Sequence, residues 1–363
     1  MEYCVLGAGL MGRAIAYDLL KQGTSLVLLA DKNTKALEEA GSFLKGNEKL
    51  ETKNLDVSNF NEVVKTLKKV DGAVTAMHYG LNLHLSKAAI EAGINLCDLG
   101  GNCDVVDEQL KLNSKAKKAG VSIIPDCGLA PGMVAVLVKY GLEKFDWADT
   151  VKIRVGGLPQ NPKGKLKYER LFSVEGLINE YIEPVRILRN GKIKTIEPLI
   201  ETEEIEFPKP YRTLEAFTTS GGTSTLIETY KSRLKNLDYK TIRYPGHCKI
   251  MREMYDSGVF FGEKRKDTAK YLEETIPLGK EDVTLVKIIF EGGSKKHELT
   301  IIDKAKPPFT SMQRMTGFSA ARISQMQARG QITKMGVQPQ ERCVDSELFI
   351  KELEKRGINI SGL

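Results

Sequence analysis

The sequence lacks the features of several protein classes. Only six of its 363 residues are cysteine, and no two of them form a Cys-x-x-Cys pair, the spacing typical of structural zinc sites. No run of about 18 uncharged apolar residues occurs, so no membrane-spanning helix is expected. The opening residues have no basic segment followed by a long apolar core, as a secretory signal would. We therefore expect a cytoplasmic protein that binds no metal and no membrane.

Charge of one sign is not concentrated anywhere in the chain either. The 54 basic and 47 acidic residues are interspersed and leave a net charge of only +7. A mild excess without a dense Lys/Arg stripe is typical of a solvated surface, so we expect no nucleic-acid partner. Hydrophobic residues make up 41% and charged residues 28% of the chain. These values are typical of globular proteins, and the length suits two domains.

A glycine-rich segment follows the first apolar run of the chain. Residues 7–12 read Gly-Ala-Gly-Leu-Met-Gly, and good helix formers follow them. In a strand-to-helix turn of this kind, Gly7 permits the tight turn and Gly9 lets the backbone approach a pyrophosphate. Gly12 lets the helix pack close to the strand.

The helix after this turn begins at Leu10 and Met11, where free N–H groups can bind phosphate. A second apolar run ends at Asp31, 24 positions after Gly7. Strand, turn, helix, strand and acid in this order predict a dinucleotide-binding site. A carboxylate at Asp31 accepts hydrogen bonds from the ribose hydroxyls and repels a 2′-phosphate, which favours NAD over NADP. The neighbouring Lys32 softens that preference.

Strand-like and helical segments alternate up to about residue 124. This alternation predicts an α/β domain with a doubly wound parallel sheet, whose ligands lie beyond the carboxyl ends of the strands. Met77, His78 and Asp126 follow predicted strands at that edge, and we expect them to contact the cofactor. Asp56 follows another strand; it lies near the adenine or caps the next helix, and the sequence leaves both interpretations open.

The middle of the chain has a different pattern, which predicts a second domain with a mixed, mostly antiparallel sheet. The dipeptide Asn190-Gly191 between alternating flanks predicts a two-residue hairpin, and residues 283–302 predict another. Further strands are expected over residues 165–172, 185–189, 205–207 and 213–217, and helices over residues 223–232 and 248–257.

A long helical pattern over residues 311–327 suggests that the chain returns to its first domain. We therefore predict a dinucleotide-binding domain of residues 1–130, completed by residues 310–363. Residues 131–309 are predicted to form the domain for substrate binding and oligomerisation.

Seven motifs, in order along nearly the whole chain, are similar to those of the saccharopine dehydrogenase family, most closely to its lysine 6-dehydrogenase branch. The glycine-rich segment is generic, whereas Gly-Leu-Ala-Pro-Gly at residues 128–132 and Arg-Tyr-Pro-Gly-His at residues 243–247 are much more specific. The motifs are residues 7–12, 98–102, 126–133, 155–159, 214–222, 243–247 and 315–320.

The resemblance implies a Rossmann domain with an inserted sheet domain, a homodimer or higher homo-oligomer, and hydride transfer between a nicotinamide and the carbon beside an amine. In the lysine 6-dehydrogenase branch, NAD oxidises the carbon that bears the ε-amine of L-lysine, and the resulting semialdehyde cyclises. The first alternative is a saccharopine- or carboxynorspermidine-type dehydrogenase acting on a secondary amine with more than one carboxylate. Such a substrate would need further cations, for which Arg154, Arg170, Arg186 and Arg212 are available. The second alternative is an inactive, NAD-binding regulatory protein.

For the catalytic roles, the candidates are Tyr79, Asp98 and His247. The resemblance places Tyr79 in the active site. Asp98, like Asp126, either handles the proton of the amine or caps the following helix. His247 has the pKa range of a proton shuttle, yet a histidine hydrogen-bonded at a helix start is an equal alternative. Cys127 is expected to be a buried packing residue, because the reaction needs no covalent step.

For the substrate, Arg243 is the candidate that binds a carboxylate, because a guanidinium pairs bidentately with such a group. Its alternative is a structural arginine that caps the turn after it. Gly157, Thr219 and Ser220 are expected to line the pocket through backbone groups, with tight turns as the alternative reason for the glycine.

Overall fold

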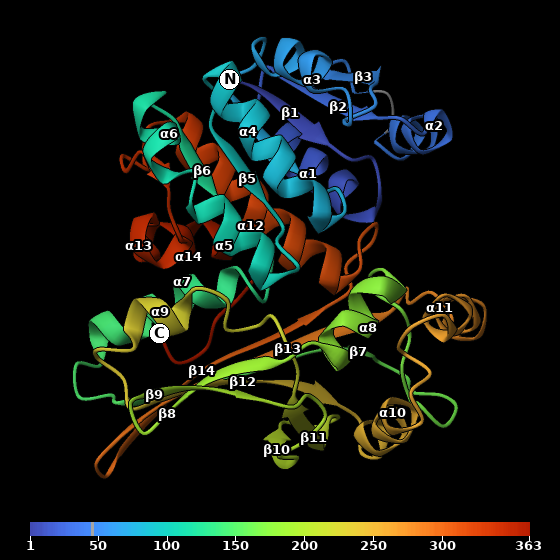
Figure 1. Cartoon of the computed structure of the whole chain (residues 1–363), viewed down its shortest axis with the longest axis vertical. Helices are drawn as coiled ribbons and strands as arrows, with labels where there is room; N and C mark the ends of the chain where they lie inside the picture. The colour runs from blue at the N-terminus through green and yellow to red at the C-terminus, as the bar shows by residue number, and fades with distance from the viewer. Residues whose placement is uncertain (45–46) are drawn as a thin grey trace. The chain divides into compact units, whose positions relative to one another are not determined.

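The computed structural model describes residues 1–44 and 47–363, and it divides the chain into two compact units (Figure 1). The first unit consists of Met1–Val136 and Gln313–Gly357, and the second of Leu137–Met312 and Ile358–Leu363. The last residues differ from our expectation, since they belong to the second unit and not to the first. Thr300 and Ser361 exchange backbone hydrogen bonds of 3.0 and 2.9 Å, which attach the end of the chain there.

The first unit is built on a seven-stranded sheet in the order β15-β6-β5-β4-β1-β2-β3, in which every described pair of strands is parallel. This order is that of a Rossmann fold with one added strand from the C-terminal return, and it confirms the predicted α/β class. The strands are β1 Glu2–Leu6, β2 Leu26–Asp31, β3 Leu50–Asn54, β4 Gly72–Thr75, β5 Leu96–Asp98, β6 Ser122–Ile124 and β15 Gly336–Val337.

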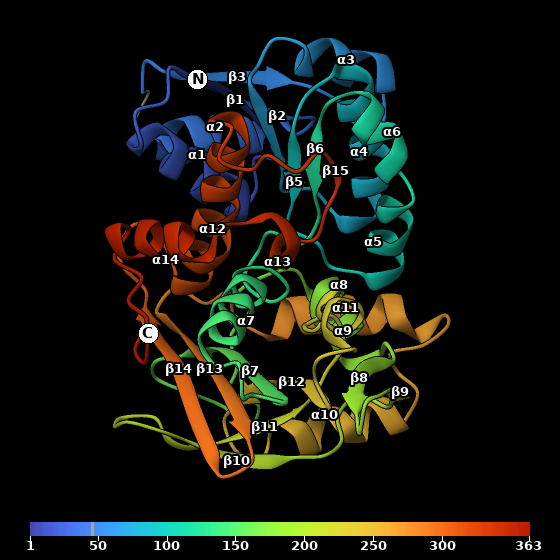
Figure 2. The same ribbon diagram turned by 90° about the vertical axis from the view of Figure 1, so that its left-hand side faces the viewer.

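Helices cover both faces of this sheet. Figure 2 shows α1 and α12 on one face and α4 and α6 on the other. Gly317 of α12 packs directly on α1, because a Cβ at that position would lie 2.7 Å from Cβ of Ala14. The helices of the unit are α1 Leu10–Lys21, α2 Thr34–Phe43, α3 Phe60–Leu67, α4 Asn82–Ala92, α5 Cys103–Leu110, α6 Asn113–Lys118, α13 Gln340–Cys343 and α14 Ser346–Lys355. Two helices cross the boundary between the units, α7 Met133–Lys144 and α12 Ser311–Ala328.

The second unit contains a mixed sheet in the order β10-β11-β12-β7-β13-β14, with β8 and β9 beside it. Among its described pairs only β12 with β7 is parallel, so the prediction of a mixed, mostly antiparallel sheet is confirmed. The strands are β7 Thr150–Pro159, β8 Val185–Arg189, β9 Lys192–Ile196, β10 Glu203–Phe207, β11 Arg212–Thr218, β12 Asn236–Arg243, β13 Asp282–Gly292 and β14 Lys295–Lys304.

Both predicted hairpins form, β8–β9 and β13–β14. Asn190 and Gly191 have φ of +52° and +72°, the left-handed pair that a tight two-residue hairpin requires. The predicted strand over residues 165–172 is wrong. Apart from an isolated bridge at Arg170 these residues form a loop, and Lys167 has a left-handed φ of +49°. Tyr168 is buried among side chains of helices that come later in the chain, whereas Leu171 is buried beside Gly157 and Gly279, so the buried positions follow no strand period.

The second unit also contains α8 Val174–Ile182, α9 Leu226–Tyr230, α10 His247–Asp256 and α11 Lys264–Thr275. Three of them, α8, α10 and α11, share one hydrophobic core with Phe217 of β11. This core holds the end of β12 and the start of α10 in place, where the Arg243–His247 motif lies. In the described part of the chain, no helix is both long and apolar enough to cross a membrane.

Candidate active site

The glycine-rich turn leads from β1 into α1 as predicted. Gly7 has a φ of +108°, and a Cβ at Gly12 would lie 1.8 Å from the carbonyl oxygen of Gly7. Glycine at these two positions is therefore required by the turn itself. A Cβ at Gly9, in contrast, would meet no atom of the described residues within 4 Å. Packing does not demand glycine at that position, whereas the close approach of a phosphate would.

The N-terminus of α1 has the properties of a phosphate site. Gly9 is its N-cap, no side chain in the described part of the chain caps it, and its first turn contains no acidic residue. The first hydrogen bond of the helix runs from the N–H of Arg13 to Gly9, so the N–H groups of Leu10 and Met11 precede the helical ladder. Free donors and the positive end of the helix dipole suit a pyrophosphate, so these residues fit a dinucleotide cofactor.

Asp31 ends β2 and supports the glycine turn. Its Oδ2 accepts a hydrogen bond of 2.8 Å from the N–H of Ala8, and its Oδ1 accepts one of 2.9 Å from Asn33. An ionised carboxylate has lone pairs left for ribose hydroxyls after these two contacts. Asp56 instead accepts from the N–H of Ser58 at 3.0 Å, and this hydrogen bond lowers the pKa of Asp56. It does not cap α3, since Asn59 does so, and its place beside the adenine stays a prediction.

The segment after β4 lies against the glycine turn. A Cβ at Gly7 would come within 3.1 Å of the Met77 sulfur, so Met77 borders the predicted phosphate site. The Nδ1 of His78 accepts a hydrogen bond of 3.2 Å from the N–H of Gly80, and the His78 and Tyr79 rings lie 4.1 Å apart. Tyr79 packs on the next loop, because a Cβ at Gly101 would lie 3.2 Å from its Cβ. These three predicted residues, which are consecutive in the chain, thus lie together in the segment after β4.

Asp98 joins the loops that follow β5 and β6. Its Oδ1 accepts hydrogen bonds from the N–H groups of Gly100 at 2.7 Å and Asp126 at 3.1 Å, and its Oδ2 accepts one from Gln109 at 2.7 Å. Burial raises the pKa of Asp98, although these hydrogen bonds oppose the shift. These contacts hold the two loops together, but Asn102 and not Asp98 caps the following helix α5, so the helix-capping alternative for Asp98 is wrong. Its catalytic role stays an untested prediction.

Asp126 and Cys127 follow β6 at the same edge. Asp126 has a φ of +62°, and a Cβ at Gly100 would lie 1.8 Å from its Oδ1, so the carboxyl group covers Gly100. Cys127 is fully buried, its thiol donates to the carbonyl oxygen of Ile124 at 3.3 Å, and burial raises its pKa. These properties suit the packing role expected for Cys127, since a reactive cysteine would need an easily formed thiolate.

The second unit contains a separate group of predicted residues, where β12 ends at Arg243 and α10 begins at His247. Gly246 has a φ of +97° in the turn between them. Glu215 of β11 closes the turn, because its carboxylate accepts from the N–H groups of Gly246 at 2.9 Å and Cys248 at 2.7 Å. Glu215 lies in the motif at residues 214–222, but no role for it was predicted from the sequence.

A chain of hydrogen bonds links Arg243 to His247. Nε of Arg243 donates to the Tyr181 hydroxyl at 3.2 Å, and that hydroxyl lies 3.0 Å from Nε2 of His247. Nδ1 of His247 lies 2.9 Å from the carbonyl oxygen of Leu166. A carbonyl oxygen only accepts, so Nδ1 carries the proton, Nε2 accepts, and the Tyr181 hydroxyl donates to it. Each hydrogen bond in this chain therefore has a fixed donor and a fixed acceptor.

His247 is a neutral side chain in this environment. It is 1% exposed, and burial together with the charge of Arg243 lowers its pKa to about 3. Both of its ring nitrogens have partners. This arrangement favours the hydrogen-bonded alternative for His247 over the proton shuttle, which no observation has tested.

The guanidinium of Arg243 is held on three sides. Its Nη1 donates to the carbonyl oxygen of Ile242 at 2.9 Å, and its carbon lies 4.9 Å from the centre of the Tyr168 ring. Nη2 lies 3.9 Å from Oε2 of Glu180, beyond hydrogen-bond distance. Within the described part of the chain no group hydrogen-bonds to Nη2, so this nitrogen is available to a ligand. Tyr168, Glu180 and Tyr181 lie outside every motif, and only the tertiary structure reveals them.

The other substrate candidates are engaged in packing. A Cβ at Gly157 would lie 2.5 Å from the terminal carbon of Met312, so space alone requires this glycine. Thr219 is 1% exposed, and its hydroxyl lies 2.7 Å from that of Thr241. The hydroxyl of Ser220 donates to the carbonyl oxygen of Asn179 at 3.2 Å. Their contacts with substrate stay predictions.

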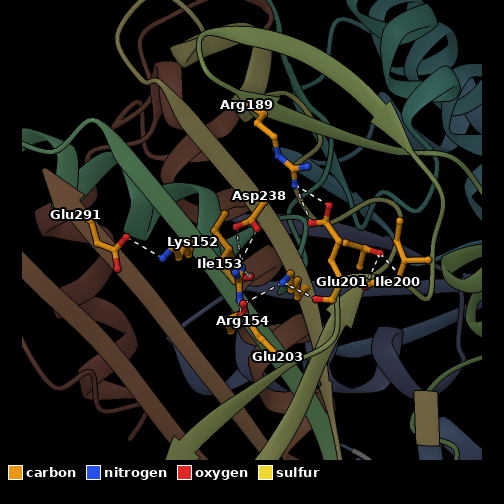
Figure 3. Close-up of polar contacts among 11 residues, drawn as sticks. Lys152, Ile153, Arg154, Arg189, Ile200, Glu201, Glu203, Asp238 and Glu291 are labelled. Carbon is orange, nitrogen blue, oxygen red and sulfur yellow. Dashed lines mark hydrogen bonds and ion pairs between the residues drawn. The ribbon is translucent and has the colours of Figure 1, made fainter. Parts of the chain in front are cut away.

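Arg154, one of the four further cations, is committed to an internal network (Figure 3). It is 1% exposed, bonds to Asp238 at 2.8 and 3.2 Å, and also pairs with Glu203. Asp238 and Arg243 are five residues apart on β12, so their side chains point to opposite faces of the sheet. Arg154 and Arg243 therefore serve different faces, and Arg154 is unsuited to bind the same substrate.

Comparison with known proteins decides the family. Residues 3–124 match the saccharopine dehydrogenase NADP binding domain, and residues 128–358 match the saccharopine dehydrogenase C-terminal domain. The chain belongs to the saccharopine dehydrogenase family. Residues 3–124 are thus an NAD(P)-binding domain. The match does not distinguish between NAD and NADP. The lysine 6-dehydrogenase branch is not singled out.

Curated relatives of this family member are distant. A saccharopine dehydrogenase [NADP(+), L-glutamate-forming] from Pyricularia oryzae is 22% identical over 78% of this chain and 62% of that protein. A carboxyaminopropylagmatine dehydrogenase from Synechocystis sp. is 26% identical over 56% of this chain and 53% of that protein. The mitochondrial alpha-aminoadipic semialdehyde synthase of Rattus norvegicus is 23% identical over 70% of this chain and 28% of that protein. The chain thus spans less than two thirds of the length of each.

A solved structure confirms the fold of the whole chain. The apo saccharopine dehydrogenase (L-Glu forming) from Saccharomyces cerevisiae superposes with a TM-score of 0.79 at 16% identity, covering 100% of this chain and 99% of that one.

Proposed function

We propose that this protein is an NAD(P)-dependent oxidoreductase that acts on the C–N bond of a secondary amine of the saccharopine or carboxynorspermidine type. The names of its relatives support such a substrate better than the primary amine of L-lysine, which the sequence resemblance suggested. The observation that carries the proposal is the buried guanidinium of Arg243, whose Nη2 receives no hydrogen-bond acceptor from the described residues. Such a group suits the carboxylate of an amino-acid substrate.

In this proposal the residues of the second unit bind and orient the substrate. Arg243 binds the carboxylate through Nη2, while Tyr181 and the carbonyl oxygen of Ile242 fix the other two guanidinium nitrogens. His247 acts as a positioning residue, because it holds the Tyr181 hydroxyl at 3.0 Å. Tyr79 remains our candidate beside the reacting amine. When bound, the nicotinamide supplies the hydride chemistry.

A substrate panel tests the proposal. Purified protein would be mixed with saccharopine, carboxynorspermidine, L-ornithine or L-lysine, each with NAD and with NADP, while the absorbance of the reduced nucleotide is followed. We expect turnover of a secondary amine. Turnover of L-lysine with release of ammonia would contradict the secondary-amine substrate and would favour the primary amine of the lysine 6-dehydrogenase branch. Nucleotide binding without turnover would favour the regulatory alternative. Homodimerisation stays a prediction, which light scattering on the same sample checks.

We further propose that NAD is the preferred nucleotide, and the Asp31→Asn variant tests this. Asparagine keeps an oxygen for the N–H of Ala8 but removes the negative charge that repels a 2′-phosphate. We expect the ratio of kcat/KM for NAD to that for NADP to fall about 10- to 100-fold, equivalent to about 1.4–2.8 kcal/mol.

The matched control for Asp31→Asn is Asp71→Asn. Asp71 precedes β4 at the opposite edge of the sheet, where it accepts from the N–H of Glu2 at 2.7 Å. We expect no change in nucleotide preference for this variant. An unchanged ratio in Asp31→Asn would remove Asp31 from the ribose site, and an initial preference for NADP would overturn the choice of NAD.

A further inference from the structure

Glu180 is an acidic side chain already placed beside the carboxylate-binding arginine. It lies near the end of α8, and its backbone carbonyl accepts a hydrogen bond of 3.0 Å from the N–H of Ser220, which holds this turn against the strand-end segment of β11. Its Oε2 lies 3.9 Å from Nη2 of Arg243. The Glu180 side chain is 30% exposed and that of Arg243 4%, so solvent reaches the acid more readily than the base.

Glu180 and Arg243 form an ion pair in which the two side chains are too far apart for a hydrogen bond. Nε and Nη1 of Arg243 each make a hydrogen bond, whereas Glu180 neutralises the guanidinium from beyond hydrogen-bond distance at Nη2. The loose contact leaves Nη2 as the position for an incoming carboxylate. Two carboxylates next to one guanidinium repel each other, which favours protonation of one of them.

We propose that Glu180 is an internal competitor of the substrate carboxylate for Arg243, and that binding of this carboxylate makes Glu180 take up one proton from solvent. This inference rests on the role given to Arg243 in the proposed function. Where Glu180 is ionised, it neutralises Arg243 in the free protein. When a carboxylate occupies Nη2, the Glu180 carboxylate accepts a proton and becomes a neutral acid, so the net charge around the guanidinium is unchanged.

The surroundings of Glu180 make it the group that titrates. Burial raises the pKa of Glu180 to about 7, and the charge of Arg243 opposes that shift only in part. The other ionisable groups of the cluster are Tyr239 on β12, Tyr168 in the loop before α8, Tyr181 on α8 and His247 on α10. Burial raises the pKa of all three tyrosines, that of Tyr168 to about 12, and the pKa of His247 is lowered to about 3. These four groups are therefore neutral near neutral pH.

The direction of the pH dependence follows from this pKa. Below it, Glu180 is neutral and Arg243 is free to bind a carboxylate; above it, ionised Glu180 competes. When a bound carboxylate keeps Glu180 protonated, only the fraction of the free protein with neutral Glu180 can bind it. This fraction, and with it the affinity for the carboxylate, falls about tenfold between pH ~6 and pH ~8. Raising the pH thus weakens binding.

The experiment measures binding of hexanoate, an aliphatic carboxylate that lacks the reacting amine and so has no amine titration. Calorimetry on the full chain at about pH 6, 7 and 8 would give the dissociation constant, and buffers of different ionisation enthalpy would give the proton uptake. We expect about tenfold weaker binding at the highest pH, with nearly one proton taken up there. In Glu180→Gln we expect a constant affinity, equal to that of the wild type at low pH.

Two further variants separate the possible failures. Glu175→Gln on the same helix is the matched control, because Glu175 is 50% exposed and pairs with Arg265, and it should follow the wild-type profile. Arg243→Met should lose hexanoate binding at every pH.

If Arg243→Met binds like the wild type, or the wild type binds no hexanoate, the carboxylate site of the proposed function fails. If Arg243 is needed but Glu180→Gln keeps the wild-type profile, only the role of Glu180 fails. Should Glu180→Gln not fold, absence of proton uptake by the wild type overturns the inference.

Discussion

The Arg243→Met variant is expected to lose about 100-fold or more in kcat/KM for the amine substrate, mainly through a higher KM. Methionine keeps an apolar side chain against Tyr168 but removes the charge and all three hydrogen-bonding nitrogens. Truncating one member of a buried, hydrogen-bonded charge pair costs about 2–5 kcal/mol, and about 2.7 kcal/mol corresponds to a factor of 100. Nucleotide affinity should not change, since the residues predicted to hold the nucleotide belong to the first unit.

The control for Arg243→Met is Arg252→Met on α10. Arg252 is a surface arginine that pairs with Glu197 at 3.0 Å and Asp256 at 2.9 Å. Exposed pairs of this kind contribute about 0–1 kcal/mol to stability, so KM should stay within about twofold. Thermal unfolding of both variants shows whether the fold is kept. A folded Arg243→Met protein with an unchanged KM would show that the substrate carboxylate binds elsewhere.

Two alanine substitutions in the glycine turn are expected to fail in different ways. In Gly12→Ala the new Cβ would lie 1.8 Å from the backbone oxygen of Gly7, so the helix must move away from β1. We expect a loss of about 3 kcal/mol or more in stability and, with it, loss of nucleotide binding. In Gly9→Ala the Cβ meets no atom of residues 1–44 and 47–363 within 4 Å, so the protein should fold normally. Nucleotide affinity should nevertheless fall about tenfold or more, because the methyl group would keep a phosphate away from the backbone.

The two glycine variants control for each other. Thermal unfolding reports the stability of each protein, and quenching of its fluorescence by NAD(H) and NADP(H) reports affinity. Normal nucleotide affinity in a folded Gly9→Ala protein would contradict a pyrophosphate at this turn. A Gly12→Ala protein as stable as the wild type would contradict the close packing of α1 on β1.

The nucleotide-binding half could be predicted closely from the sequence, because its signals are local. The glycine spacing, the helix that starts at Leu10 and the acid at the end of β2 each depend on a few neighbouring residues. Parallel strands that alternate with helices permit few topologies, so the sheet edge with Met77, Asp98 and Asp126 also followed from their positions in the chain. Likewise, Asn190-Gly191 required no distant contact to specify its hairpin.

Assignments that depend on long-range contacts were less secure. The loop over residues 165–172 has an apolar pattern like that of a strand, but Tyr168 is buried against helices that come later in the chain, and Leu171 is buried beside Gly157 and Gly279. The position of Asp98 at a strand end makes it a candidate proton acceptor, and only the structure shows that its two oxygens also accept three hydrogen bonds. A carboxylate at a strand end has the same sequence signal in both roles, and only its partners distinguish them.

The sequence by itself determined the family, the Rossmann topology and the glycine turn of this protein, since short motifs and regular periods specify them. Only the tertiary structure decided how Arg243 is held, which tautomer His247 adopts, and that Glu180 faces the guanidinium. Tyr181, Leu166 and Glu215 come from separate segments that meet Arg243 and His247 only after folding. The physical reason is burial: removal from water lowers the pKa of His247 and raises that of Glu180, and no local pattern encodes which groups become buried together.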